Sequence, residues 1–160
     1  MGSKLIAAVA AAVVLGLVAF MFLPAAATPP DNLTATVVAM GATAKPVSVH
    51  SNGIEVESRG ATDIYTVHNV FAVAQPPSSS GWHSHPGAVF VTVTAGTLTL
   101  YRRTCVPRTY SAGQTFVERG RRDVVLARNE GAVQAETITT LIVPHEVATR
   151  IDQPGHCGLL

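Results

Sequence analysis

Short stretches of alternating apolar and polar residues dominate the chain from Ile54 to its end. Clusters of Gly, Pro, Ser and Asn separate these stretches, for example at 76–81 and 128–131, and such clusters mark turns. No window after Pro24 carries the 3.6-residue period of an amphipathic helix. Regularly spaced short strands of this kind predict an all-β sandwich or barrel. The expected strands are 54–58, 62–73, 88–94, 97–103, 114–117, 123–128, 133–143 and 147–151.

The N-terminus carries a targeting or anchoring signal. An unbroken apolar run from Leu5 to Leu23 follows Lys4, and Ala25-Ala26-Ala27 provides a cleavage site of the A-x-A type. The run is close to the roughly 20 residues that span a bilayer. Residues 1–27 are therefore either a cleaved signal peptide or a retained membrane anchor, in each case a hydrophobic helix.

The position of the only charge in this segment predicts where the protein is located. Because Lys4 precedes the apolar run, the positive-inside rule places the remainder outside the cytoplasm. We expect an extracytoplasmic protein, secreted or anchored to the outer face of the cytoplasmic membrane. Residues 28–53 are expected to form a tether with one early strand, and residues 54–160 to form the barrel domain.

The net charge of the residues after position 27 limits the kinds of molecule that this protein can be expected to bind. Ten of the eleven basic residues lie beyond residue 27, and they are balanced there by ten acidic residues. This zero net charge gives no footprint for nucleic acid, whose binding needs a basic surface. We therefore expect contact with a membrane only through the N-terminal segment. The expected partners are a small molecule or a metal ion, and a homodimer is compatible with these features.

Both cysteines, Cys105 and Cys157, lie in the part predicted to be exported. An even number of cysteines in an oxidising compartment predicts a disulfide bond. Two free thiols acting as metal ligands are the alternative. That alternative is weaker, because neither cysteine has a second ligand at the x2 spacing of zinc motifs.

Two histidines, His83 and His85, are separated by one residue just before a predicted strand. Side chains at i and i+2 of a strand point to the same face, and this face continues through Val89, Val91 and Val93. Two imidazoles on one face can share a metal ion. The alternative is an ordinary polar pair in a loop.

The sequence around these histidines resembles the cupin superfamily. The first cupin motif is G-x5-H-x-H-x3,4-E-x6-G, and His83, His85 and Gly96 occupy its histidine and final glycine positions. The stretch GWHSHPGAVFVTVTAGTLTLY looks like the small single-domain bacterial cupins, and the resemblance extends over about residues 54–158. It implies a jelly-roll barrel with a metal or ligand site in its mouth, although this fold carries many unrelated activities.

The motif positions that differ decide which residues the resemblance offers as ligands. Val89, or Phe90 with the longer spacing, occupies the glutamate position of the first motif. In the second motif, G-x5-P-x-G-x2-H-x3-N, Gly120 is retained, whereas Glu118 occupies the proline position and Asp123 the histidine position. The asparagine position is Ala127.

Carried over by position, the resemblance implies His83, His85 and Asp123 as ligands of one Zn, Fe or Mn ion. The rival role for Asp123 is a salt bridge, because Arg119, Arg121 and Arg122 surround it in the sequence. His68 is a candidate fourth ligand, and a hydrogen-bonded structural histidine is the other interpretation.

The residues of the ligand pocket are expected to be Trp82, Val89, Val91 and Val125, although Trp82 can also simply pack the rim. Three functions follow from these patterns. The first is an exported cupin that binds a divalent metal, a small ligand, or both. The second is a metal-dependent dioxygenase or isomerase with a two-histidine, one-aspartate site. The third is a metal-free binding or structural module. The sequence leaves enzymatic activity open.

Overall fold

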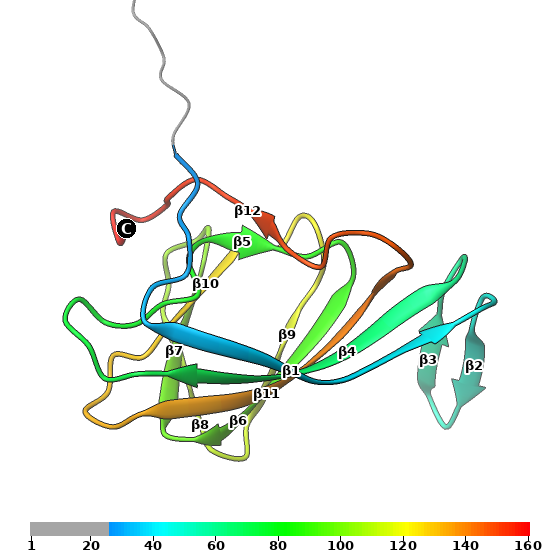
Figure 1. Cartoon of the computed structure of the whole chain (residues 1–160), viewed down its shortest axis with the longest axis horizontal. Coiled ribbons are helices and arrows are strands. Elements are labelled where there is room, and N and C mark those ends of the chain that lie inside the picture. Colours follow the sequence, from blue (N-terminus) through cyan, green and yellow to red (C-terminus); the bar gives the residue numbers. More distant parts are fainter. Residues whose placement is uncertain (1–25) are drawn as a thin grey trace, which may run out of the picture.

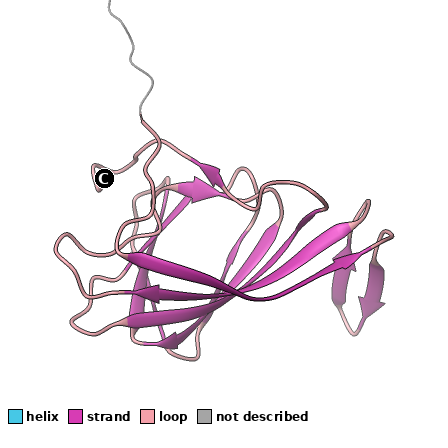
Figure 2. Ribbon diagram, viewed as in Figure 1, coloured by secondary structure: helices cyan, strands magenta, loops and turns pink. Residues whose placement is uncertain are grey.

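The structure is a computed structural model that describes residues 26–160, and every regular element in that range is a strand (Figures 1 and 2). The expected hydrophobic helix at residues 1–27 falls almost wholly outside the described residues. Within residues 26–160, the structure contains no helix of the length and apolar character needed to cross a membrane.

Two five-stranded antiparallel sheets form the barrel (Figure 1). The first sheet has the order β1 (Leu33–Thr43), β4 (Thr62–Phe71), β11 (Ala135–Pro144), β6 (Ala88–Ala95) and β9 (Thr115–Glu118). The second has the order β12 (Ile151–Asp152), β5 (His83–Ser84), β10 (Val125–Arg128), β7 (Thr97–Arg102) and β8 (Arg108–Ser111). A separate hairpin of β2 (Ser48–Ser51) and β3 (Ile54–Glu57) projects from one side (Figure 1). This double-sheet arrangement confirms the predicted all-β, jelly-roll fold class.

The core lies between the two sheets because the strands alternate inward and outward residues. Strand β11 shows this most clearly, with every second side chain buried along almost its whole length. A fully buried Val, Leu or Phe side chain stabilises a fold by about 1.5–3 kcal/mol relative to an exposed one. The core consists of Phe71, Val89, Val91, Val93, Leu98, Leu100, Phe116, Val125, Ala127, Ala135, Leu141 and Val143.

Two glycines with positive φ lie at turns where the backbone closely approaches another segment. At Gly96 (φ 66°), a Cβ atom would lie 2.4 Å from the backbone oxygen of Gln134, so the turn between β6 and β7 packs closely on the start of β11. At Gly81 (φ 64°), a Cβ would lie 2.1 Å from the oxygen of Thr28. The chain entering the barrel therefore packs directly against the segment that leads to His83.

Residues 28–53 contain two strands, β1 and β2, where one early strand was expected, and the structure adds β5 and β8, which the pattern does not predict. Strand β1 is nearly uniformly exposed and so lacks the alternation on which the prediction depends, although it pairs with β4 along its whole length. The barrel thus begins before residue 54. Strand β5 has two residues, which is too short for any pattern.

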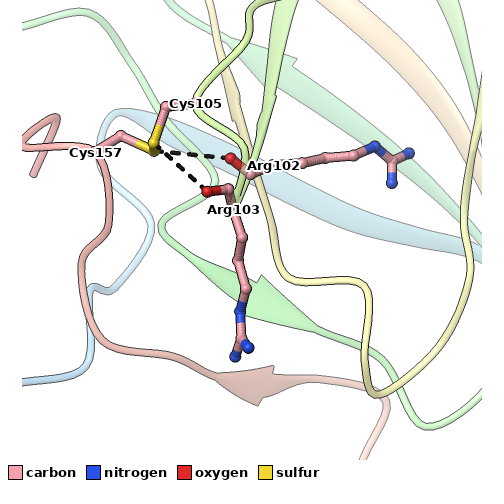
Figure 3. Close-up of a disulfide and its surroundings, with 4 residues drawn as sticks. All are labelled: Arg102, Arg103, Cys105 and Cys157. Atoms are coloured by element: carbon pink, nitrogen blue, oxygen red, sulfur yellow. Dashed lines mark hydrogen bonds between the residues drawn. A yellow bond between two sulfur atoms is a disulfide. The ribbon is translucent and has the colours of Figure 1, made fainter.

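Cys105 and Cys157 form the predicted disulfide bond, with an S–S distance of 2.03 Å and Cα atoms 5.5 Å apart (Figure 3). The bond joins the loop after β7 to the tail that follows β12. In Figure 3 the bridge lies beside the backbone of Arg102 and Arg103, whose carbonyl oxygens are each 3.7 Å from a sulfur. The free-thiol alternative is therefore wrong.

Candidate metal centre

His83 and His85 come from β5 and the residue after it. Strand β5 is held on both sides, since His83 pairs with Val125 of β10 and with Asp152 of β12. Both imidazoles are buried, and their ring centres lie 4.8 Å apart at an interplanar angle of 88°. The structure thus brings the two predicted histidines together on one face, as their spacing requires.

The Nδ1 atom of each imidazole ring is hydrogen-bonded to a backbone carbonyl. The Nδ1 of His83 donates to the oxygen of Gly81 at 2.9 Å, and the Nδ1 of His85 donates to the oxygen of Thr149. A carbonyl oxygen can only accept, so each Nδ1 must carry the proton. In the neutral ring, Nε2 then offers a lone pair to the interior, which is how metal-binding histidines are usually oriented.

The third member of the cluster is Glu118, the last residue of β9. It lies on the same face as Phe116, and the pairing of β6 with β9 places it directly opposite Val89. Its side chain is buried, and its Oε2 lies 3.0 Å from His85 Nε2 and 3.7 Å from His83 Nε2. One ligand atom from each of the three residues falls within 4.8 Å of the others.

The surroundings of Glu118 Oε2 favour a cation. This atom is buried and accepts no hydrogen bond from residues 26–160 that meets normal geometry. Leaving a carboxylate oxygen unpaired in the interior is costly. With Nδ1 protonated on both rings, two nitrogen lone pairs face this oxygen, and only a proton or a metal ion between them makes the arrangement favourable. The donor set of two imidazoles and one carboxylate fits Zn, Fe or Mn.

The protonation tendencies agree with this interpretation. Burial, together with the positive charge of Arg150, lowers the pKa of His83 to about 4, even though Glu118 opposes the change. Burial alone would raise the pKa of Glu118, but the hydrogen bond from His85 and the positive charge that the two histidines supply when protonated outweigh it, so the net shift is downward. Neutral His83 and ionised Glu118 are the forms that bind a metal.

Asp123 lies outside the cluster, which corrects the ligand set expected from the resemblance. Both of its carboxylate oxygens accept from Nη1 of Arg102, and Oδ2 also accepts from the backbone N–H of Arg119 at 2.9 Å. The rival prediction of a salt bridge describes this better, although the partner is Arg102. Strand β10 begins only at Val125, after a turn in which the Asp123 N–H donates to the oxygen of Gly120. The alternation used to orient Asp123 does not extend that far.

His68 does not reach the cluster. It lies in β4, where its Nε2 is 2.9 Å from Oε2 of Glu136 on the neighbouring strand β11. This is the hydrogen-bonded structural role that was the alternative to a fourth ligand.

A cavity of about 300 Å³ extends from the cluster into the barrel. Val89 and Val91 line it, as expected. Val125 is packed in the core but does not line the cavity. Trp82, just before β5, packs in a separate cluster with Val124 and Leu126; the rim-packing interpretation of Trp82 is therefore the better one.

Sequence reasoning missed Glu118 and Arg150, both of which line the cavity. For Glu118 a signal existed, because it follows the predicted strand 114–117 in phase with the apolar Phe116. Arg150 sits next to the very short β12, where alternation cannot be recognised.

Comparison with known proteins finds no matching protein-family model and no similar curated protein. Among solved structures, a cupin-like protein from Thermotoga maritima is 19% identical, with 84% of this chain and 89% of that chain covered and a TM-score of 0.45. A cupin superfamily protein from Desulfitobacterium hafniense is 7% identical, with coverages of 68% and 82% and a TM-score of 0.44. An oxalate oxidase is 24% identical over 48% of this chain, with a TM-score of 0.40, and the match spans 40% of its length. Function has to be inferred from the residues of the site.

Proposed function

We propose that this protein binds one divalent metal ion through His83, His85 and Glu118, and a small ligand in the cavity beside it. The observation that carries the proposal is the buried Oε2 of Glu118, which has no hydrogen-bond partner among residues 26–160 and which imidazole nitrogens approach from β5 and from the residue after it. Three protein ligands leave coordination positions open for water or for a ligand. When bound, the ion would act as a Lewis acid toward a group that occupies an open position.

The charge of the centre favours an anionic ligand. Two neutral histidines, one carboxylate and a divalent ion together carry one positive charge. Arg150 lines the same cavity, and its Nε is bonded to Asp152 while its Nη2 is buried without a hydrogen-bond partner within residues 26–160. A positive centre beside a guanidinium group, enclosed by low-dielectric walls, attracts a negative group such as a carboxylate.

The other walls of the cavity are mainly apolar, with Phe71, Leu98 and Leu141 among them. Asn69 provides a polar contact within this wall, and its Nδ2 donates to the hydroxyls of Thr137 and Thr139 at 3.1 and 2.9 Å. A ligand with one anionic end and a short apolar body matches this division. Such a distribution, a mostly apolar pocket with a few polar groups, is usual for small-molecule sites.

Catalysis is the second candidate. Two histidines and one carboxylate are the ligand set of many non-haem iron oxygenases, which favours a dioxygenase or an isomerase that uses Glu118 in place of the expected Asp123. A metal-free module is the third. Location outside the cytoplasm belongs to the same proposal, supported by the apolar run before residue 24 and by the disulfide bond.

Elemental analysis of the full chain by mass spectrometry, purified without chelator, tests the metal. We expect about one equivalent of Zn, Mn or Fe in the wild type and a large loss in His83→Ala. Calorimetric titration of the metal-free protein with Zn(II), Mn(II) and anaerobic Fe(II) then ranks the ions. Absence of metal from the purified protein and of binding at millimolar ion concentrations would favour the metal-free module.

A further inference from the structure

The positive charge of this chain is concentrated in one segment. Six of the eleven basic residues lie between positions 102 and 122, namely Arg102, Arg103, Arg108, Arg119, Arg121 and Arg122. The same segment, extended to residue 123, contains two acidic residues, Glu118 and Asp123. Glu118 faces the cavity and Asp123 is paired with Arg102. A chain of formal net charge +1 therefore has a strongly positive region.

Three of these arginines lie where the barrel has an open seam. Strand β8 is the last strand of the second sheet and β9 the last strand of the first, so within residues 26–160 neither pairs with a further strand on its outer side. A groove of about 560 Å³ lies between the β7–β8 hairpin and β9. Phe116 lines both this groove and the central cavity, which makes it part of the wall between them.

The lining of the groove combines positive and apolar groups. Three arginines line it, Arg102, Arg108 and Arg119, and within the described residues no acidic side chain does. Val106, Tyr110 and Phe116 supply apolar surface, and Val106 is 62% exposed. Arginine guanidinium groups beside apolar and aromatic walls suit an organic anion better than a bare inorganic ion.

The three arginines have different roles. Arg102 already has partners, because its Nη1 donates to Asp123 and its Nη2 donates to the oxygen of Val117 at 2.9 Å, which links β7 to β9 across the seam. Arg108, at the start of β8, and Arg119, just after β9, form no ion pair with any residue in 26–160. Two unneutralised guanidinium groups thus line one groove from its opposite edges.

We propose that this groove is a second ligand site, separate from the metal centre, for an organic phosphate or sulfate ester with an apolar or aromatic body. Two guanidinium forks offer up to four N–H donors, which suits an ester group with three terminal oxygens better than a carboxylate with two. Thr104 and Thr115 add hydroxyls to the same lining. The body of the ligand lies against Val106 and Tyr110.

Calorimetric titration of the full, metal-free chain with phenyl phosphate, phenyl sulfate and inorganic phosphate tests this site. We expect at least one of the two esters to bind more tightly than inorganic phosphate, because only they contact the apolar wall. Arg108→Gln and Arg119→Gln are each expected to weaken that binding about 10-fold, since a charge-assisted hydrogen bond is lost. The comparison between the two esters identifies the preferred oxyanion.

Two variants serve as controls. Arg121→Gln removes an exposed arginine that does not line the groove and is expected to leave binding unchanged. Glu118→Gln alters the metal centre and is also expected to leave ester binding in the groove unchanged. The two proposals can therefore be refuted independently of each other. The proposal is overturned if neither ester binds at millimolar concentration, if Arg121→Gln weakens binding as much as Arg108→Gln, or if Glu118→Gln abolishes it.

Discussion

Replacing Glu118 by glutamine is expected to remove most of the thermal stabilisation that a divalent metal gives to the protein. The change keeps the size of the side chain and removes the charge that lies 3.0 Å from His85 Nε2. Asp123→Asn is the matched control, because it makes the same chemical change at the carboxylate that the sequence motif predicts and the structure places on Arg102. Both variants are compared with the wild type, with and without metal.

The size of the metal-induced rise in Tm follows from the linkage between ion binding and folding. An ion present at about 100 times its dissociation constant stabilises the folded state by roughly 2.7 kcal/mol. Residues 26–160 make up a domain of 135 residues. At about 2.1 cal/mol/K per residue, the unfolding entropy of such a domain is roughly 0.28 kcal/mol/K, so Tm should rise by about 10 °C. Losing an outer-shell partner of a metal ligand already weakens binding about 10–100-fold, so loss of the charged ligand itself should weaken it on the order of 100-fold or more. This reduces the rise in Tm to about 1–2 °C or less at the same ion concentration.

Differential scanning fluorimetry with Zn(II) or Mn(II) measures these shifts. Asp123→Asn should lower the Tm of the metal-free protein, since it breaks a half-buried ion pair, but keep the metal-induced rise of about 10 °C. The reasoning is refuted if Asp123→Asn abolishes the rise while Glu118→Gln retains it. It is equally refuted if no divalent ion raises the Tm of the wild type.

Three further predictions concern stability, each measured by denaturant or thermal unfolding. The double variant Cys105→Ser with Cys157→Ser should lose about 4 kcal/mol, because the disulfide closes a loop with a sequence separation of 52; no change under oxidising conditions would contradict this. Gly96→Ala should be strongly destabilised by contact with Gln134 O, whereas Gly113→Ala, with the same sign of φ but open space around it, provides the control. Asp63 raises the pKa of His145 through a hydrogen bond of 2.7 Å, and His145 in turn lowers the pKa of Asp63. This pair should therefore stabilise the fold fully below pH 6.5 as long as Asp63 is ionised, and lose its effect as pH rises through the elevated pKa of His145; His145→Gln should lack this pH dependence.

The fold was predictable because alternation is a property of long strands with one face in the core. Strands β4, β6 and β11 have eight to ten residues each, and the pattern locates all three. Strand β1 is as long but exposed on both faces, so its residues carry no alternation. Backbone hydrogen bonds to β4, and not a buried face of side chains, hold β1 in the sheet.

The site was predictable only in part because its ligands come from two strands. His83 and His85 are two residues apart in one segment, and their relation can be read from spacing alone. The relation of Glu118 to them depends on β9 pairing with β6, and no local pattern contains that register. Asp123 was misassigned for the opposite reason, because matching a motif position assumes a strand geometry that the turn after Gly120 interrupts.

The register between β6 and β9 also explains how the site can lack the expected glutamate at Val89 and still hold a carboxylate. Val89 and Glu118 are directly paired across the two strands. Cβ atoms of such partners lie about 4.5–5.5 Å apart on the same face, a separation that a glutamate side chain can span. A carboxylate on either strand can therefore reach the point that the two Nε2 atoms face. The apolar residue at 89 then leaves room for the side chain from 118, and the two positions are best treated as one unit of the site. Exchanging them, with Val89→Glu and Glu118→Val together, should restore metal binding that Glu118→Val alone abolishes; failure of the exchange in a correctly folded protein would show that β9 itself, and not only its carboxylate, is required.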